Sequence, residues 1–133
     1  MAGETNLSQL IKGMKPELNQ GEYVFASVKT LDGIGRKDTI CEFKESEGTT
    51  LVIERKKADK LNLDYGYIAS WITLKIHSSL DGVGLTAVFA TELAKNNISC
   101  NVVAGYYHDH IFVAKKDAEK AIAVLTQLSQ SYS

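Results

Sequence analysis

Two short stretches of the sequence contain most of the residues that could do chemistry. The first, HDH at 108–110, places two imidazoles two residues apart, so both can lie on one face of a strand and bind zinc or transfer protons. The second, LDGVG at 80–84, follows His77 and has the glycines and the acidic residue that often begin a helix. The first backbone N–H groups of such a helix suit a carboxylate or another anion.

The HDH stretch lacks the remaining ligands that a metal site needs. A closed zinc site uses four protein ligands and a catalytic one usually three plus water, and no further Cys or His stands nearby at ligand spacing. Asp109 would point to the opposite face of a strand from His108 and His110. We therefore predict a hairpin turn with largely solvent-facing side chains. A role in an interface or in closing over a ligand stays open, as does a metal or enzyme site that combines these histidines with His77.

The loop at 80–84 has two interpretations. As a binding site, the backbone of Gly82, Val83 and Gly84 would donate hydrogen bonds to a carboxylate. Asp81 would pair with an ammonium group, and His77 could pair with a carboxylate. As a purely structural turn, Asp81 would cap the following helix and the glycines would permit a tight bend. The residues alone leave both interpretations open.

The first half of the chain is strand-rich. Apolar residues at helical spacing predict a short helix over 7–14, capped by Thr5 or Asn6 and stopped by Pro16. Strands are expected at 23–29 and in a hairpin over 39–54. The segment that follows the hairpin can form one or two helical turns.

The second half has the clearer periodicity. After a strand at 71–78, a helix over 83–95 is predicted to bury a stripe of apolar residues, Val83, Ala87, Ala90, Leu93 and Ala94. A hairpin follows, in which Tyr106 and Tyr107 should alternate faces so that one is buried. A second helix is marked by Ala118, Ala121, Ile122, Leu125 and Leu128. This order of elements predicts an α+β fold of ferredoxin-like type, βαββαβ, with antiparallel strands and both helices on one face.

The two halves share a short repeat. LDGIG at 31–35 and LDGVG at 80–84 differ at one position, and each follows a β-like run. Aligning the halves there also matches their later strands, although the first half lacks the helix after its loop, which would make a poorer anion site. We interpret the chain as two related modules, 1–66 and 67–133, which pack closely and can form one structural unit.

The composition excludes several classes of protein. The 133 residues have a net charge of -1 with dispersed basic residues, which argues against nucleic-acid and anionic-membrane partners. No stretch is apolar enough for a membrane span, and the nucleotide-binding and hydrolase motifs are missing. Cys41 and Cys100 lie in apolar runs without metal-type spacing, so we expect reduced core thiols and a cytoplasmic protein.

The second half resembles an ACT domain, of the kind found in the regulatory part of aspartate kinases. The family's D-x-x-G turn matches Asp81 and Gly84, its small-residue helix leads into an A-x-x-x-I-x segment at 94–99, and the DAE-x-A start of its last helix matches 117–121. The family often has proline where Val83 stands. The resemblance is strong over 71–128 and weak before it, and the whole chain looks like small stand-alone bacterial proteins with two ACT-like units.

The resemblance implies a function. ACT domains pair side by side, and many bind a free amino acid at the interface near the turn after strand one. Asn101 lies at the matching position of strand two and offers both a donor and an acceptor. We therefore predict a non-enzymatic regulatory or sensor module, a homodimer or higher oligomer without cofactor, that binds an amino acid through His77, Asp81, Gly82, Val83, Gly84 and Asn101. A pure assembly domain with a filled pocket is the other non-enzymatic alternative.

Overall fold

The computed structural model describes residues 6–77 and 82–132, which form two compact units. Unit 1 combines residues 1–19 with 71–133, and unit 2 comprises residues 20–70. The first segment of the chain therefore groups with the last part of the sequence. The reason is a short strand, β1, Pro16–Leu18, which pairs with a strand more than fifty residues later.

Unit 1 is built on four strands in the order β1-β5-β7-β6. Strand β5, Ile68–Leu74, pairs antiparallel with β1, and Glu17 lies opposite Thr73. Strands β6, Asn101–Ala104, and β7, Asp109–Ala114, form an antiparallel hairpin. Strand β1 thus supplies the outer strand that the second half of the sequence lacks. The predicted ferredoxin-like α+β class is confirmed.

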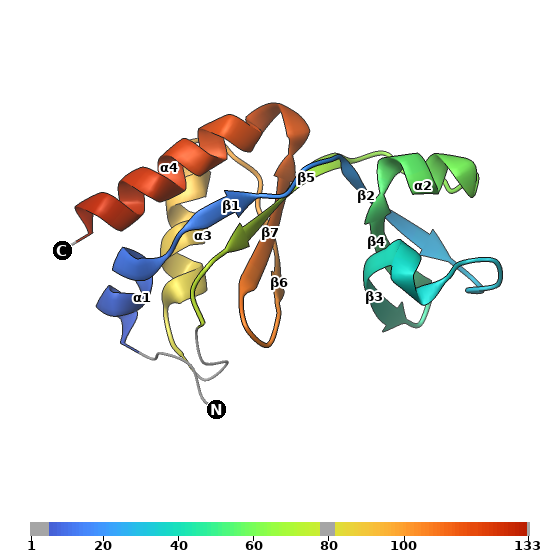
Figure 1. Ribbon diagram of the computed structural model, residues 1–133, viewed down its shortest axis with the longest axis horizontal. Coiled ribbons are helices and arrows are strands. Elements are labelled where there is room, and N and C mark those ends of the chain that lie inside the picture. The colour runs from blue at the N-terminus through green and yellow to red at the C-terminus, as the bar shows by residue number, and fades with distance from the viewer. Residues whose placement is uncertain (1–5, 78–81, 133) are drawn as a thin grey trace. The chain divides into compact units, whose positions relative to one another are not determined.

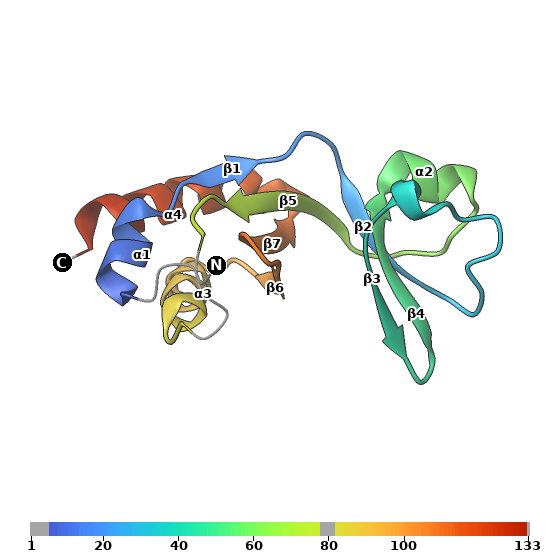
Figure 2. The same ribbon diagram turned by 60° about the horizontal axis from the view of Figure 1, so that its bottom comes forward.

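Three helices cover one face of these strands (Figures 1 and 2). They are α1, Leu7–Gly13, α3, Leu85–Lys95, and α4, Ala118–Ser131, the last preceded by the 3-10 turn η2, Lys115–Asp117. Alternate strand residues point into the core beside them, Ile72, Leu74, Ile111 and Val113. None of the helices described in residues 6–77 and 82–132 is both long and apolar enough to cross a membrane.

The buried face of α3 differs from the predicted stripe. Val83 precedes the helix and is 82 % exposed, and Ala87 and Ala94 also face solvent. Of the predicted stripe Leu93 is fully buried, and it is joined by Leu85 and Phe89, so the buried residues are spaced by four. These larger side chains remove more apolar surface from water than the alanines, and they set the orientation of the helix. The stripe predicted for α4 is confirmed at Ala118, Ala121 and Leu125.

Unit 2 is a curled antiparallel sheet with one short helix. Its strands are β2, Tyr23–Val28, β3, Thr39–Glu45, and β4, Gly48–Glu54, in the order β3-β4-β2, and the first residues of β5 pair with β2. Helix α2, Arg55–Lys60, contributes Ala58 to a buried cluster that also includes Val24 and Ile53. Between β2 and β3 stands only the 3-10 turn η1, Arg36–Asp38, where unit 1 has α3.

Both cysteines are less deeply buried than a core position would be. Cys41 lies in β3 and Cys100 just before β6, and both are free thiols at half-buried positions. Burial raises the pKa of each thiol, and that of Cys100 reaches about 11. The thiols are therefore protonated and weakly nucleophilic near neutral pH.

Candidate functional site

Strand β5 ends, α3 starts and the β6–β7 hairpin turns at one end of unit 1 (Figure 1). Three aromatic rings meet there. The His77 ring centroid lies 6.0 Å from that of Tyr106 and 5.3 Å from that of Tyr107, and the two tyrosine rings meet edge to face at 5.0 Å. Both tyrosines are largely exposed, at 60 % and 63 %. This end of unit 1 therefore presents an aromatic surface to solvent.

The expectation that one of these tyrosines is buried is wrong, and the turn explains why. The Gly105 N–H donates to the His108 carbonyl at 2.9 Å, so Tyr106 and Tyr107 form the tip of the hairpin and do not follow the alternation of a strand. A Cβ atom at Gly105 would lie 2.9 Å from that carbonyl and 3.3 Å from the ring of His110. Glycine therefore allows the tight approach of the two strands.

The start of α3 lies at this end of unit 1. Gly84 is its N-cap residue, with φ of 100°, and the Val88 N–H donates to the Gly84 carbonyl at 3.0 Å. Glycine has no side chain to cap the first N–H groups of the helix. A Cβ at Gly84 would lie 3.1 Å from Leu7 of α1, so the turn packs closely on its neighbour. Gly82 and Val83 lead into this turn, and Asp81 lies outside the described residues.

Asn101 lies away from the other candidate residues within one subunit. It begins β6, opposite Phe112, and its side chain is exposed. Strand β6 follows the C-terminal end of α3, whereas Gly84 precedes its N-terminal end. Eleven helical residues span about 16 Å. The structure thus brings His77 and the glycine turn to one end of unit 1 and places Asn101 toward the other.

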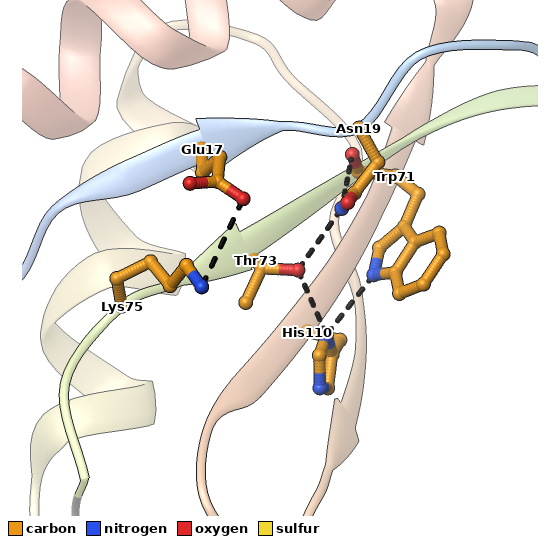
Figure 3. Close-up of polar contacts among 6 residues, drawn as sticks. All are labelled: Glu17, Asn19, Trp71, Thr73, Lys75 and His110. Carbon is orange, nitrogen blue, oxygen red and sulfur yellow. Dashed lines mark hydrogen bonds and ion pairs between the residues drawn. The ribbon is translucent and has the colours of Figure 1, made fainter.

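A polar network lies on the sheet face opposite the helices (Figure 3). The indole N–H of Trp71 donates to His110 Nδ1 at 3.0 Å, and the Thr73 hydroxyl lies 3.1 Å from the same nitrogen. The side-chain amide of Asn19 donates to Thr73 Oγ1 at 2.9 Å and to the Trp71 carbonyl at 3.2 Å. An indole can only donate, so Nδ1 is the acceptor and the neutral ring has its proton on Nε2.

This network was not foreseen from the sequence, and its electrostatics favour a neutral imidazole. Burial is the main cause that lowers the pKa of His110. The charges of His108 and Lys75 lower this pKa further, whereas the Asp109 carboxylate raises it. Lys75 also faces Glu17 across β1 and β5 at 3.9 Å, a long and exposed ion pair that contributes little to stability. Alternation along β5 could have placed Trp71 and Thr73 on one face, but nothing local signals the long-range contact with Asn19.

The prediction of largely solvent-facing side chains in HDH is wrong for all three residues. Strand β7 begins at Asp109, which is only 9 % exposed and shares a face with Ile111 and Val113 of the core. His110 points to the other face and is half-buried. Burial raises the pKa of the Asp109 carboxyl, although the two neighbouring histidines lower it. His108 is also half-buried, and its Nδ1 has no hydrogen-bond partner among the described residues.

The contacts of His77 differ from those of His110. Residues 6–77 and 82–132 contain no group of three or more His, Cys, Asp or Glu side chains placed to hold a metal ion. His77 contacts the tyrosines of the hairpin tip, whereas the Nδ1 atom of His110 accepts the Trp71 hydrogen bond. The aromatic surface and the turn before α3 can instead contact a small molecule by ring stacking and backbone hydrogen bonds.

Comparison with known proteins gives two sequence matches and several similar structures. The ACT domain family matches residues 2–70 and again 67–127. A crystal structure of a protein of unknown function from Vibrio cholerae, described as a possible transport protein, is 45 % identical, with a TM-score of 0.81 over 95 % of this chain and 98 % of that one. No curated protein matches the sequence.

Two more distant structures share the fold. The regulatory subunit of aspartate kinase from Thermus thermophilus is 9 % identical, with a TM-score of 0.58 over 85 % of this chain and 95 % of that one. The aspartate kinase of Clostridium acetobutylicum is 18 % identical, with a TM-score of 0.59 over 86 % of this chain and 34 % of that one. From the two sequence matches and the Vibrio cholerae relative, the chain belongs to the ACT domain family.

Proposed function

We propose that the protein is a non-enzymatic regulatory module that binds a free amino acid at the aromatic end of unit 1 and acts through the pairing of two copies. Membership of the ACT family supports a regulatory rather than a catalytic role. The observation that carries the proposal is the ring cluster of half-buried His77 with exposed Tyr106 and Tyr107, at the end where α3 starts with a glycine cap.

The chemistry of this end suits an amino acid. The carboxylate would accept hydrogen bonds from the backbone at Gly82, Val83 and Gly84, where the helix end favours negative charge. The Asp81 side chain would pair with the ammonium group, and His77 with the tyrosine rings would form a wall against the ligand side chain. No cofactor enters this proposal.

The position of Asn101 suggests how a second copy takes part. Strand β6 is the outer strand opposite β1 in the order β1-β5-β7-β6, and three of its four residues are exposed. Two copies related by a two-fold axis between Val102 and Val103 would pair these strands antiparallel. Asn101 of the partner subunit would then lie opposite Ala104, beside the hairpin tip. A dimer would thus complete the site that one subunit leaves open.

We also propose that the chain arose from two ACT-like modules, 1–66 and 67–133. The two family matches support this division. In the folded protein, residues 1–19 belong to the same compact unit as residues 71–133 of the second module. A cytoplasmic setting is proposed from the two free thiols, because an oxidising compartment would favour their oxidation.

Ligand binding is tested by thermal unfolding with each of the twenty amino acids. A ligand of the native state at a hundredfold excess over its dissociation constant adds about 2.7 kcal/mol to stability and raises the midpoint. Tyr106→Ala and Asp81→Ala should weaken or abolish this rise without unfolding the protein. Phe43→Ala is the matched control, because Phe43 is an exposed aromatic residue of unit 2. A response that both Tyr106→Ala and Asp81→Ala leave unchanged would exclude this site.

Pairing through β6 is tested by sedimentation. Val102→Lys places a charge on the exposed strand and should convert the dimer to a monomer and reduce ligand affinity. Ile40→Lys makes the same change on the outer strand of unit 2 and should leave the dimer intact. A stable dimer in the Val102→Lys variant would refute this interface. A dimer that binds none of the amino acids would favour the pure assembly domain.

A further inference from the structure

A separate pocket of about 340 Å³ lies within unit 2, where β2 begins and β4 passes into α2. Its lining consists of two carboxylates, two cationic side chains, an amide and a glycine, which are Glu22, Glu54, Arg55, Lys56, Gln20 and Gly21. Its volume is near the lower end of the range for small-molecule sites. The pocket belongs to unit 2, whereas the proposed amino-acid site belongs to unit 1.

The guanidinium of Arg55 is held in place by neighbours. Its Nη1 donates to Glu22 Oε1 at 2.9 Å, and its Nε donates to the Tyr65 hydroxyl at 3.0 Å. That hydroxyl in turn donates to Asp59 Oδ1 at 2.7 Å. The Nη2 group makes no hydrogen bond with the described residues, and the side chain is 39 % exposed. A fixed guanidinium with free donors is prepared to receive a carboxylate, because little side-chain entropy is lost on binding.

Glu54 supplies the negative charge of the pocket that is not paired with Arg55. Among the described residues, the side chains of Glu54 and Lys56 make no hydrogen bond or ion pair, and both residues are exposed. Gly21 has a φ of 107°, and a Cβ there would lie 3.2 Å from Glu54 Oε2. Glycine therefore keeps side-chain atoms out of the space next to this carboxylate.

We infer that this pocket binds a small zwitterion, with its carboxylate on Arg55 and Lys56 and its ammonium group on Glu54. The balance of charge supports this class of ligand over others. A multiply charged anion would meet two carboxylates, and a simple amine would meet two cations, whereas a molecule with both charges satisfies each side. The chain then has a second ligand site, whose residues differ from those of the proposed amino-acid site of unit 1.

The test follows the backbone amide of Gly21 in nitrogen-15 NMR spectra of the full chain during titration with each of the twenty amino acids. The strongest ligand is then replaced by its N-acetyl and its carboxamide derivatives. We expect a saturable shift of the Gly21 signal with the free amino acid and a loss of affinity of at least about tenfold when either charge is removed. Glu54→Gln should cause a similar loss for the free amino acid.

Matched variants separate the local effect from a change in net charge. Glu47→Gln and Lys60→Gln alter exposed charges of unit 2 outside the pocket lining and should leave the Gly21 response intact, whereas Lys56→Gln should weaken it. An amino acid that shifts Gly84 and Tyr106 but not Gly21 would overturn this inference and leave the proposed function standing. No shift at Gly21 with any of the twenty, or equal affinity in Glu54→Gln, would also overturn it.

Discussion

Replacing His110 by asparagine should separate two properties of its imidazole, the acceptance of the Trp71 hydrogen bond and the ability to titrate. The Oδ1 atom of asparagine occupies about the position of Nδ1, so an acceptor for the indole N–H remains. Leucine offers no acceptor and removes a partner from both Trp71 and Thr73. We expect His110→Leu to be about 1–2 kcal/mol less stable than His110→Asn, toward the low end for a lost buried partner because Trp71 is only half-buried.

The pH dependence follows from the lowered pKa of His110. Between the folded and the unfolded pKa, the unfolded chain binds more protons, so the unfolding free energy falls as the pH drops below the unfolded value of about 6.5. The slope is at most about 1.4 kcal/mol per pH unit. His110→Asn removes this titration and should lose less stability on acidification. Asp109, whose pKa is raised, contributes a slope of opposite sign in both proteins, and the comparison largely cancels it.

Trp71 provides a fluorescence signal for unfolding that comes from one known position, because it is the only tryptophan of the chain. Urea unfolding followed by its fluorescence at several pH values between about 5 and 7 gives the unfolding free energies. Imidazole nitrogen-15 spectra of the native protein should show His110 protonated at Nε2 and not at Nδ1. Equal pH slopes in wild type and His110→Asn, or a proton on Nδ1, would refute the reasoning.

Three further changes have expected outcomes. Phe89→Ala empties a fully buried position of α3 and should lower the unfolding free energy by about 3–5 kcal/mol in urea denaturation. Asn6→Ala removes the acceptor for the Gln9 N–H at the start of α1 and should cost about 1 kcal/mol by the same assay. Cys100, with its pKa of about 11, should react with iodoacetamide more slowly in the native protein than in urea at pH 8, and equal rates by mass spectrometry would contradict that pKa.

Where local periodicity was strong, the sequence predicted the elements well. The α4 stripe, the β3–β4 hairpin and the β6–β7 hairpin are all present, because spacing in a helix and alternation in a strand leave a pattern in neighbouring residues. Asn6, one of two predicted caps, accepts the Gln9 N–H at 3.0 Å. These features depend on residues that are close together along the chain.

The features that were missed depend on contacts between distant segments. Strand β1 has three residues and begins with Pro16, so its pairing with β5 has no local signature. The burial of Asp109 follows from where β7 begins, which is set by the closed turn at Gly105. Likewise, His110 became part of a network only because Trp71 stands on the same sheet face. What the sequence did not predict about the β5–β7 region is therefore mainly the environment of individual side chains.

The two glycine loops show how one sequence pattern gives different chemistry. In LDGVG, Gly84 has φ of 100° and begins an eleven-residue helix without a side-chain cap of its own. In LDGIG, Gly35 has φ of -77° and precedes a three-residue turn, and its N–H donates to Asp38 Oδ2 at 3.2 Å. Asp38 also pairs with Lys57 at 3.3 Å. The protein's own carboxylate thus occupies the Gly35 donor of the first loop, and this difference supports the proposal that an external carboxylate binds at the second loop.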